Sequence, residues 1–174
     1  MEDDDPMKTV FKGPVFRIES GIVREPGGVR ARRDIIRHSG SVAILPVADD
    51  GRIILVRQYR CVFGVPLVEL PAGRIDGGET ARAAARRELR EEIGMDARRF
   101  ERLLRIVPSP GFLDETVTIY RASGLFPSPR AADEDERIEC VRLSLATALR
   151  RVRTGAIEDA KTVTALLLEA GRRG

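Results

Sequence analysis

The sequence predicts an α+β fold in which helices cover a mixed β-sheet on both sides, an αβα sandwich. Apolar runs with strand character precede and follow one long helical segment, and two further helical segments end the chain. A doubly wound parallel sheet would need more helices between its strands. With 174 residues, the chain is expected to form one domain.

The N-terminal part is expected to be a short tail followed by strands. Residues 1–10 begin with acidic and polar side chains and are predicted to be a flexible tail. Residues 11–38 are typical of two or three strands, broken at Gly21 and at the turn EPGG. We expect residues 39–174 to form the main domain.

The central part is predicted to contain a hairpin, a short strand and the long helix. The hairpin spans residues 41–60, where ADDG supplies the turn, and LVELPAG is a strand stopped by Pro71. Thr80 is predicted to cap a helix that runs to about Ile93 and is terminated by Gly94.

The C-terminal part is predicted to contain three strands and two helices. The strands are FERLLRIVPSPGF, ETVTIYRASGL and RIECVRLS, with a Pro-rich and acidic loop before the last. The first helix begins near Ser144 and stops by Gly155, and the second begins near Glu158. The second helix is expected to carry three apolar residues on one face: Val163, Leu166 and Leu167.

Composition excludes several classes of function. The net charge is only +3, from 30 basic and 27 acidic residues, so no nucleic-acid partner is expected. The acidic start is unlike a signal peptide and the apolar stretches are too short to span a bilayer, which favours a cytoplasmic protein with no membrane partner. Cys61 and Cys140 lack metal-ligand spacing, and a single histidine, His38, removes most triad and zinc-site designs.

The segment GRIDGGETARAAARRELREEIGM, residues 73–95, gathers three carboxylates on one helix. Glu88 and Glu92 share a face and Glu91 lies beside them, although like charges at this spacing repel. A solvated charged face is the simpler interpretation. Hard cations such as Mg²⁺, however, bind through a few carboxylates and substrate phosphate oxygens, and the glycine-rich loop before the helix suits that use.

This segment resembles the signature of the Nudix hydrolases. The signature is Gly, five residues, Glu, seven residues, Arg-Glu, an aliphatic residue, any residue, Glu-Glu, any residue, Gly and an aliphatic residue. The matching positions here are Gly73, Glu79, Arg87, Glu88, Leu89, Glu91, Glu92, Gly94 and Met95. Chance agreement at the seven fixed positions is roughly a one-in-a-billion event per window. The resemblance implies a Nudix-type αβα sandwich with a central catalytic loop-helix-loop and an N-terminal β extension. It also implies Mg²⁺-dependent hydrolysis, with Mn²⁺ as a substitute, of a nucleoside diphosphate linked to another group.

Flanking stretches resemble the ADP-ribose pyrophosphatase branch of that family. They are VRQYR, LVELPAGRID, the proline in PSPGFLDE, DEDERIE and GAIEDAKTVTALLL. The branch implies that a small nucleotide sugar, ADP-ribose, is hydrolysed to AMP and ribose 5-phosphate. Hydrolysis of a GDP-sugar, a dinucleoside polyphosphate or coenzyme A is an alternative, as is a non-catalytic module that senses ADP-ribose-like ligands.

The resemblance implies roles for individual residues. Glu134 would be the general base that activates the attacking water, although Glu134 and Glu136 could exchange roles. Glu91 would bind a further ion or act through water, and Arg87 would brace the helix. The implied catalytic residues are thus Glu134, Glu91 and Arg87. The implied metal ligands are Glu88, Glu92, Glu91, Glu136 and the backbone carbonyl of Ala72. The implied substrate contacts are Arg37, Arg60, Arg74, Ser109, Pro110, Gly111 and Glu115.

The resemblance also implies an oligomeric state. Members of the branch are commonly homodimers whose N-terminal strands reach across to the partner's site. The strands expected within residues 11–38 are consistent with such a dimer arm, and an extra sheet packed within one subunit is the alternative.

Overall fold

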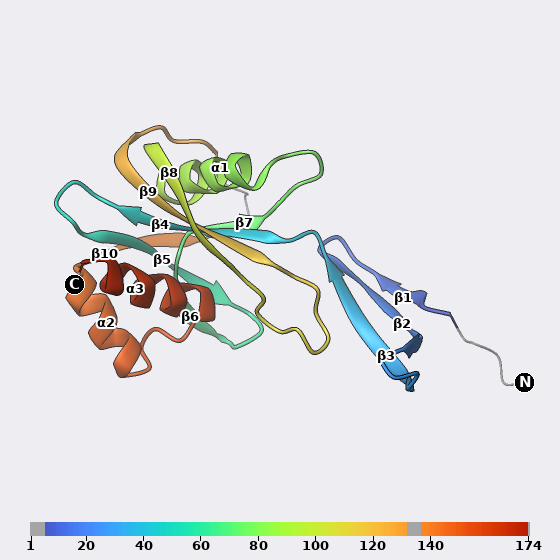
Figure 1. Cartoon of the computed structure of the whole chain (residues 1–174). Coiled ribbons are helices and arrows are strands. Elements are labelled where there is room, and N and C mark those ends of the chain that lie inside the picture. The colour runs from blue at the N-terminus through green and yellow to red at the C-terminus, as the bar shows by residue number, and fades with distance from the viewer. Residues whose placement is uncertain (1–5, 132–136, 174) are drawn as a thin grey trace, which may run out of the picture.

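A computed structural model describes residues 6–131 and 137–173 and shows two sheets and three helices (Figure 1). A three-stranded antiparallel sheet projects as an arm from a body built on a seven-stranded mixed sheet. Within the body, α1 lies on one side of the sheet, and α2 and α3 lie on the other. The predicted α+β sandwich with an N-terminal β extension is confirmed.

The order of strands and helices along the chain agrees with the apolar runs: in the described ranges, seven strands precede α1, and three more precede α2 and α3. The strands are β1 (Lys8–Lys12), β2 (Phe16–Arg24), β3 (Arg30–His38), β4 (Ser41–Val47), β5 (Ile53–Arg60), β6 (Val65–Glu69), β7 (Ala72–Arg74), β8 (Met95–Ile106), β9 (Val117–Pro127) and β10 (Ile138–Leu143). The helices are α1 (Ala81–Ile93), α2 (Leu145–Arg153) and α3 (Ala160–Arg173). None of the helices in the described ranges is both long and apolar enough to cross a membrane.

The larger sheet has the order β10-β5-β4-β9-β8, with β6 added to β5 and β7 added to β4. Strands β4 and β9 run parallel, and the other pairs run antiparallel. The predicted hairpin is present, but β4 and β5 pair only at Val47 and Ile53. The two strands then separate, because β4 pairs with β7 and β9 while β5 pairs with β6 and β10.

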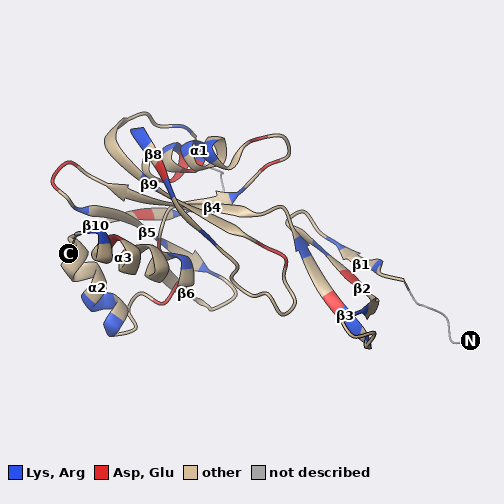
Figure 2. Ribbon diagram, in the orientation of Figure 1, with Lys and Arg blue, Asp and Glu red and all other residues tan. Residues whose placement is uncertain are grey.

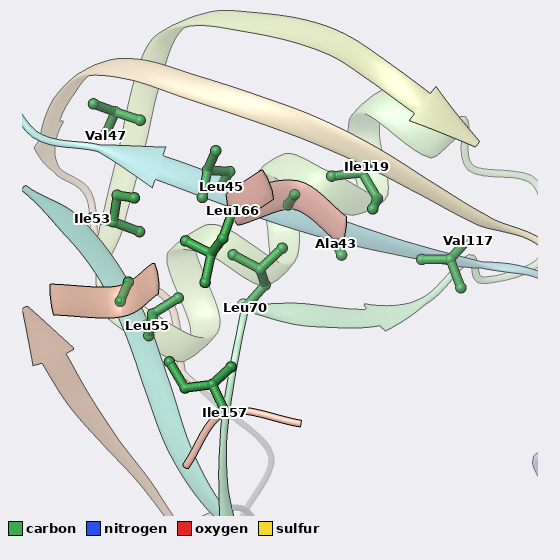
Figure 3. Close-up of a cluster of buried hydrophobic side chains, with 12 residues drawn as sticks. Ala43, Leu45, Val47, Ile53, Leu55, Leu70, Val117, Ile119, Ile157 and Leu166 are labelled. Carbon is green, nitrogen blue, oxygen red and sulfur yellow. The ribbon is translucent and has the colours of Figure 1, made fainter. Parts of the chain in front are cut away.

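Strand β4 is the centre of the body because it is buried on both faces. Val42 and Ile44 belong to one apolar cluster with residues of α1, namely Ala84, Ala85 and Leu89. Ala43, Leu45 and Val47 face the opposite way and form a second cluster with α2, α3 and neighbouring strands (Figure 3). Alternation along an extended strand sends successive side chains to opposite faces, so one strand supports both layers of helices.

The two C-terminal helices begin at side-chain caps. The Ser144 hydroxyl accepts a hydrogen bond from the N–H of Thr147 at 3.2 Å, and Asp159 Oδ2 accepts one from the N–H of Thr162 at 3.0 Å. Such caps satisfy N–H groups that the first helical turn leaves unpaired. The expectation that Leu167 shares the buried face of α3 is wrong, because this side chain is 56% exposed. The buried residues of α3 recur at helical spacing: Thr162, Ala165, Leu166 and Glu169.

The N-terminal sheet differs from the sequence-based expectation in two ways. Strand β1 begins at Lys8 and pairs with β2, so residues 8–10 belong to the sheet, and residues 1–5 of the expected tail lie outside the described ranges. Strand β2 also runs without a break through Gly21, which pairs with Arg33. A Cβ at Gly21 would lie 2.8 Å from backbone atoms of Met7, so this glycine permits a close approach of two chain segments.

The arm is joined to the body along β3 and the loop between β8 and β9. The N–H of Ile36 donates to the carbonyl of Phe112 at 2.7 Å, and the N–H of Asp114 donates to the carbonyl of Ile36 at 3.1 Å. Arg74 of β7 also donates to the carbonyl of Pro14 at 2.8 Å. These bonds position the arm at the edge of the body, whereas every residue of β1 remains exposed.

We predict that Gly94→Ala lowers the free energy of unfolding by about 1 kcal/mol, because Gly94 ends α1 in the left-handed region at φ +67°. Urea unfolding followed by circular dichroism measures the change. Gly171→Ala is the matched control, because Gly171 lies within α3 and an added Cβ meets open space. This control should keep or raise stability. Equal stability of Gly94→Ala and the wild type would contradict the prediction.

Candidate active site

Helix α1 presents an apolar side to the sheet and an acidic side to β7. Thr80 begins the helix as predicted, since its hydroxyl accepts a hydrogen bond from the N–H of Ala83 at 3.2 Å. Helix α1 carries both basic and acidic side chains, and the acidic ones lie in its second half (Figure 2). Glu88 and Glu92 lie one turn apart, and each is 8% exposed. Two carboxylates are therefore held close together in a largely buried setting, as the helical spacing predicts.

The backbone of β7 lies directly against these carboxylates. A Cβ added at Gly73 would overlap the carboxylate of Glu88. The N–H of the preceding residue, Ala72, donates to Glu92 Oε2 at 3.2 Å. The requirement for glycine at the start of the signature is thus steric: only a residue without a side chain lets the strand approach the acidic helix this closely.

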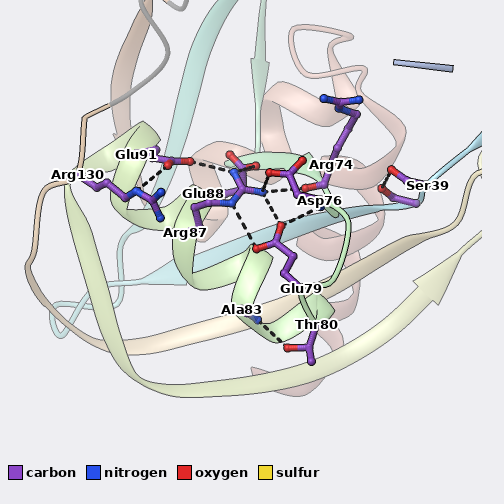
Figure 4. A network of polar contacts seen from close by, with 11 residues as sticks. Ser39, Arg74, Asp76, Glu79, Thr80, Ala83, Arg87, Glu88, Glu91 and Arg130 are labelled. Atoms are coloured by element: carbon purple, nitrogen blue, oxygen red, sulfur yellow. Dashed lines mark hydrogen bonds and ion pairs between the residues drawn. The ribbon is translucent and has the colours of Figure 1, made fainter. Parts of the chain in front are cut away.

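Arg87 is the central cation of the acidic cluster (Figure 4). Its Nη2 donates to Glu79 Oε1 at 2.8 Å and to the backbone carbonyl of Arg74 at 2.9 Å. Its Nη1 donates to Glu88 Oε1 at 2.7 Å and to Glu91 Oε2 at 3.0 Å. One guanidinium therefore connects the loop before α1, the helix itself and β7. This contact pattern supports the bracing role expected for Arg87.

The charges in this cluster stabilise one another. The hydrogen bond from Arg87 holds the pKa of Glu79 below its ordinary value, and the same bond raises the pKa of Arg87. A second guanidinium reaches the cluster from the other side, since Arg130 Nε lies 3.1 Å from Glu91 Oε1. Two arginines thus bind carboxylates that would otherwise repel each other.

The chemistry of these donors suits a hard divalent cation. Mg²⁺ prefers carboxylate, carbonyl and water oxygens and usually keeps several waters. The crowding of Gly73 against Glu88 leaves a carboxylate cradle at the strand edge that a Cβ would fill. Within residues 6–131 and 137–173, however, no three acidic, histidine or cysteine side chains form a ready ligand set. The acidic side chains that the structure describes here are instead arranged around Arg87.

Two cavities adjoin the cluster and share part of their lining. One, of about 380 Å³, lies over the acids and is lined by Glu88, Glu91 and Arg87 among others. The other, of about 300 Å³, extends toward the first turn of α3. Residues common to both linings form the boundary between the cavities: Arg60, Ala72, Gly73 and Arg74. Two arginines therefore lie beside a route that leads away from the carboxylates.

The predicted substrate contacts fall into two groups. Arg60, Arg74 and Glu115 line the cavity of about 300 Å³. By contrast, Arg37, Pro110 and Gly111 line a separate cavity of about 520 Å³ between the arm and the loop before β9. Ser109 belongs to the same loop, and its carbonyl accepts a hydrogen bond from the N–H of Leu113 at 3.1 Å.

Arg37 is held by acidic side chains within the arm and the adjoining loop. Its Nε donates to Glu19 Oε2 at 2.7 Å, and its Nη1 lies 3.3 Å from Asp114 Oδ2. The hydrogen bond to Glu19 raises the pKa of Arg37, so the guanidinium stays charged. Within this chain, Arg37 therefore joins the arm to the loop and lines a cavity other than the two beside the acidic cluster.

Two predicted residues lie outside the structure's described ranges, and two cavity-lining residues were not predicted. Glu134 and Glu136 lie outside the described residues, so their roles stay predictions. Asp159 and Lys161 line the cavity of about 300 Å³ but were missed from the sequence. The signal for them was the stretch GAIEDAKTV, which resembles the C-terminal helix of the branch but carries no obvious catalytic pattern.

Residues 37–166 match the model of the NUDIX domain. The chain belongs to the NUDIX family. Members of this family typically use divalent metal ions, in agreement with the oxygen-rich cluster on α1. The matched range includes the whole seven-stranded sheet and ends within α3.

Individual relatives and a solved structure agree with the family assignment. The chain is 38% identical over 159 residues to the "ADP-ribose pyrophosphatase" of Bacillus subtilis, covering 90% of this chain and 86% of that protein. It is equally similar, with the same coverage, to the "Methanol dehydrogenase activator" of Bacillus methanolicus. A crystal structure of an ADP compounds hydrolase superimposes with a TM-score of 0.83 at 28% identity, covering 97% of this chain and 94% of the other.

We predict that Gly73→Ala lowers Mn²⁺ affinity by about 10–100-fold, because the new methyl group displaces a carboxylate of this NUDIX site. Electron paramagnetic resonance of free Mn²⁺ measures the affinity, and thermal unfolding shows whether the fold survives. Gly77→Ala is the matched control in the same loop, since a Cβ there meets nothing within 4 Å. Unchanged Mn²⁺ affinity in Gly73→Ala would contradict the prediction.

Proposed function

We propose that this protein hydrolyses a nucleoside diphosphate sugar, with ADP-ribose as the preferred substrate and AMP and ribose 5-phosphate as the products. The observation that carries the proposal is the carboxylate cluster of α1, which opens past Arg60 and Arg74 into a second cavity. This arrangement suits a diphosphate bridge that lies between metal-binding acids on one side and guanidinium groups on the other.

The choice of an ADP-linked substrate rests on the relatives. Two proteins that are 38% identical to the chain, from Bacillus subtilis and Mycobacterium tuberculosis, are named ADP-ribose pyrophosphatase. Relatives named GDP-mannose pyrophosphatase are 32–33% identical and match 79% of the chain. The higher identity and fuller coverage favour ADP-ribose over a GDP-sugar as the first substrate to test.

The residues of the chain would divide the chemistry as follows. Glu88, Glu92 and the carbonyl of Ala72 would hold Mg²⁺ or Mn²⁺, with Glu91 and Glu136 binding a further ion. A bound ion neutralises phosphate oxygens, lowers the pKa of its water and stabilises the entering and leaving groups.

The protein groups around the diphosphate would orient it and move one proton. Glu134, or Glu136 in its place, would accept a proton from the attacking water. The water oxygen then bonds to one phosphorus, and the anhydride P–O bond on that phosphorus breaks. Arg60 and Arg74 would contact phosphate oxygens, and Glu115 would contact the ribose side. Arg37, from the arm, and residues 109–111, from the loop between β8 and β9, would also contact substrate.

A substrate panel tests this function directly. The purified protein is assayed with Mg²⁺ on ADP-ribose, ADP-glucose, GDP-mannose, a dinucleoside polyphosphate and coenzyme A, and phosphomonoester products are scored. We expect the highest kcat/KM for ADP-ribose. Preference for GDP-mannose would shift the assignment to GDP-sugars, and tight ADP-ribose binding without turnover in Mg²⁺ or Mn²⁺ would indicate a sensor module.

We predict that Glu92→Gln lowers kcat by about 10²-fold or more, since it removes one charge from the proposed ion site. Glutamine keeps an oxygen that can accept the bond from the N–H of Ala72, so the fold should survive. Steady-state kinetics and thermal unfolding are the measurements. Asp50→Asn, at the exposed turn between β4 and β5, is the control. Near-normal Mg²⁺-dependent turnover in Glu92→Gln would refute the metal assignment.

We further propose that the protein is a homodimer joined through the arm. A three-stranded sheet needs a buried apolar face to be stable on its own. The arm carries exposed apolar side chains, including Phe11 and Phe16, whose tilted rings have centroids 5.6 Å apart. A second copy that covers this sheet would bury those groups. It would also bring the partner's arm toward the cavity that Arg37 lines.

We predict that the wild type sediments as a dimer and that Phe11→Asp sediments as a monomer, because a charge on β1 opposes burial. Sedimentation velocity at several concentrations is the measurement. Leu167→Asp is the control, as Leu167 is an apolar residue on α3, away from the arm, and is 56% exposed against 48% for Phe11. A monomeric wild type, or the same shift in both variants, would contradict the proposal.

A further inference from the structure

Glu69 is a buried carboxylate that has no part in the proposed chemistry, and it contacts Arg60 at the boundary of the two cavities. Glu69 ends β6 and is 2% exposed. Its Oε1 accepts a hydrogen bond from Arg60 Nε at 2.6 Å, and its Oε2 accepts one from Arg60 Nη2 at 3.0 Å. Lys161 Nζ also donates to Oε2, at 2.6 Å. This buried carboxylate is thus shared by two cations from different elements.

Lys161 comes from the first turn of α3, far from Glu69 in sequence. Its ammonium group also donates to Asp159 Oδ1 at 2.7 Å, and Asp159 caps the same helix. The set therefore contains two carboxylates and two cations, and it links the end of β5, the end of β6 and the start of α3. Burial opposes ionisation of Glu69, but the bonds from Arg60 and Lys161 outweigh it and keep the pKa of Glu69 below its ordinary value.

The geometry leaves part of Arg60 available for a ligand. A guanidinium has five N–H donors, and Glu69 takes one from Nε and one from Nη2. The side chain of Arg60 is 37% exposed and lines both cavities of the candidate active site. Glu69 therefore fixes the guanidinium at this boundary, and the donors that it does not occupy are three N–H groups of Nη1 and Nη2.

We propose that Glu69 and Lys161 are positioning residues that hold the Arg60 guanidinium at the boundary of the two cavities, where it binds a phosphate group of the substrate. The inference rests on the proposed function and deepens it. Lys161 neutralises one of the two negative charges of Glu69 and Asp159. The whole group therefore does not cancel the positive charge that Arg60 presents to a phosphate. Without Lys161, Glu69 and Asp159 together would offset the charge of Arg60.

A second buried carboxylate that contacts arginines, also linked to α3, serves as a control that distinguishes positioning of Arg60 from general stabilisation of the fold. Glu169, near the other end of α3, is 1% exposed and lies 3.1 Å from Arg121 Nε and 4.0 Å from Arg172 Nε. This group also joins α3 to the sheet through a buried carboxylate. Glu169, Arg121 and Arg172 are absent from the linings of the two adjoining cavities. Loss of Glu169 should therefore affect stability without affecting the ligand.

The test compares Lys161→Met, Glu69→Gln and Lys161→Arg with Glu169→Gln in the full chain. With the best substrate of the panel, Lys161→Met and Glu69→Gln should each raise KM about 10-fold and leave kcat within about twofold, as expected when ground-state binding is lost. Lys161→Arg should restore KM to within about threefold of the wild type. Glu169→Gln should lower the melting temperature but keep the wild-type KM.

A binding measurement keeps the inference testable even if no panel substrate is hydrolysed. Calorimetry with adenosine 5′-(α,β-methylene)diphosphate needs no turnover and should show Kd about 10-fold weaker in Lys161→Met and Glu69→Gln. The inference would be overturned if both variants kept the wild-type Kd and KM, or if Glu169→Gln raised KM as much as they do. It would also be overturned if the wild type did not bind this diphosphate. Absence of turnover with normal binding would instead overturn the proposed function alone.

Discussion

The site depends on one guanidinium placed among carboxylates that would otherwise repel. Arg87 binds Glu79 at the end of a loop, Glu88 and Glu91 in the middle of α1, and a backbone carbonyl of β7. Three segments that reach the site by different routes are therefore fixed by one side chain. Because this side chain is only 17% exposed, the ion pairs are shielded from solvent and depend on one another.

Apolar packing supplies the frame that makes this electrostatic cluster possible. Strand β4 is buried on both faces, so α1 packs on one side while α2 and α3 pack on the other. The small residues Ala84 and Ala85 bring α1 close to the sheet, and Gly73 brings the adjoining strand close to the acids. The carboxylates are held in place by backbone elements with little freedom, which is what a site of fixed geometry requires.

The sequence was most informative where the structure is local. The spacing of Glu88 and Glu92, the cap at Thr80 and the terminator Gly94 follow from the geometry of one helix, and all are found where predicted. Contacts between distant segments could not be read in this way. Glu69 and Lys161 meet across 92 positions, and only the tertiary fold shows that they share a partner.

Errors of interpretation had equally specific causes. Gly21 was read as a strand break because glycine weakens strands, whereas here it allows another segment to pass close by. Leu167 is expected on one face of α3 with Val163 and Leu166, yet its angular position on the helix leaves it exposed. In both cases the residue type alone was insufficient, because the outcome depends on which other segment of the chain packs against that residue.

Strands β4 and β5 separate after a single paired position, and this has a consequence for how the ligand preference of the fold can evolve. The cavity lined by Ser41 of β4 and Arg60 of β5 lies where the two strands have different hydrogen-bonding neighbours. Side chains at its margin, other than at Gly73, can therefore be exchanged without loss of the backbone hydrogen bonds that place these strands. A scaffold of this kind can acquire new ligand preferences through substitutions at the margin while its folding pattern stays the same.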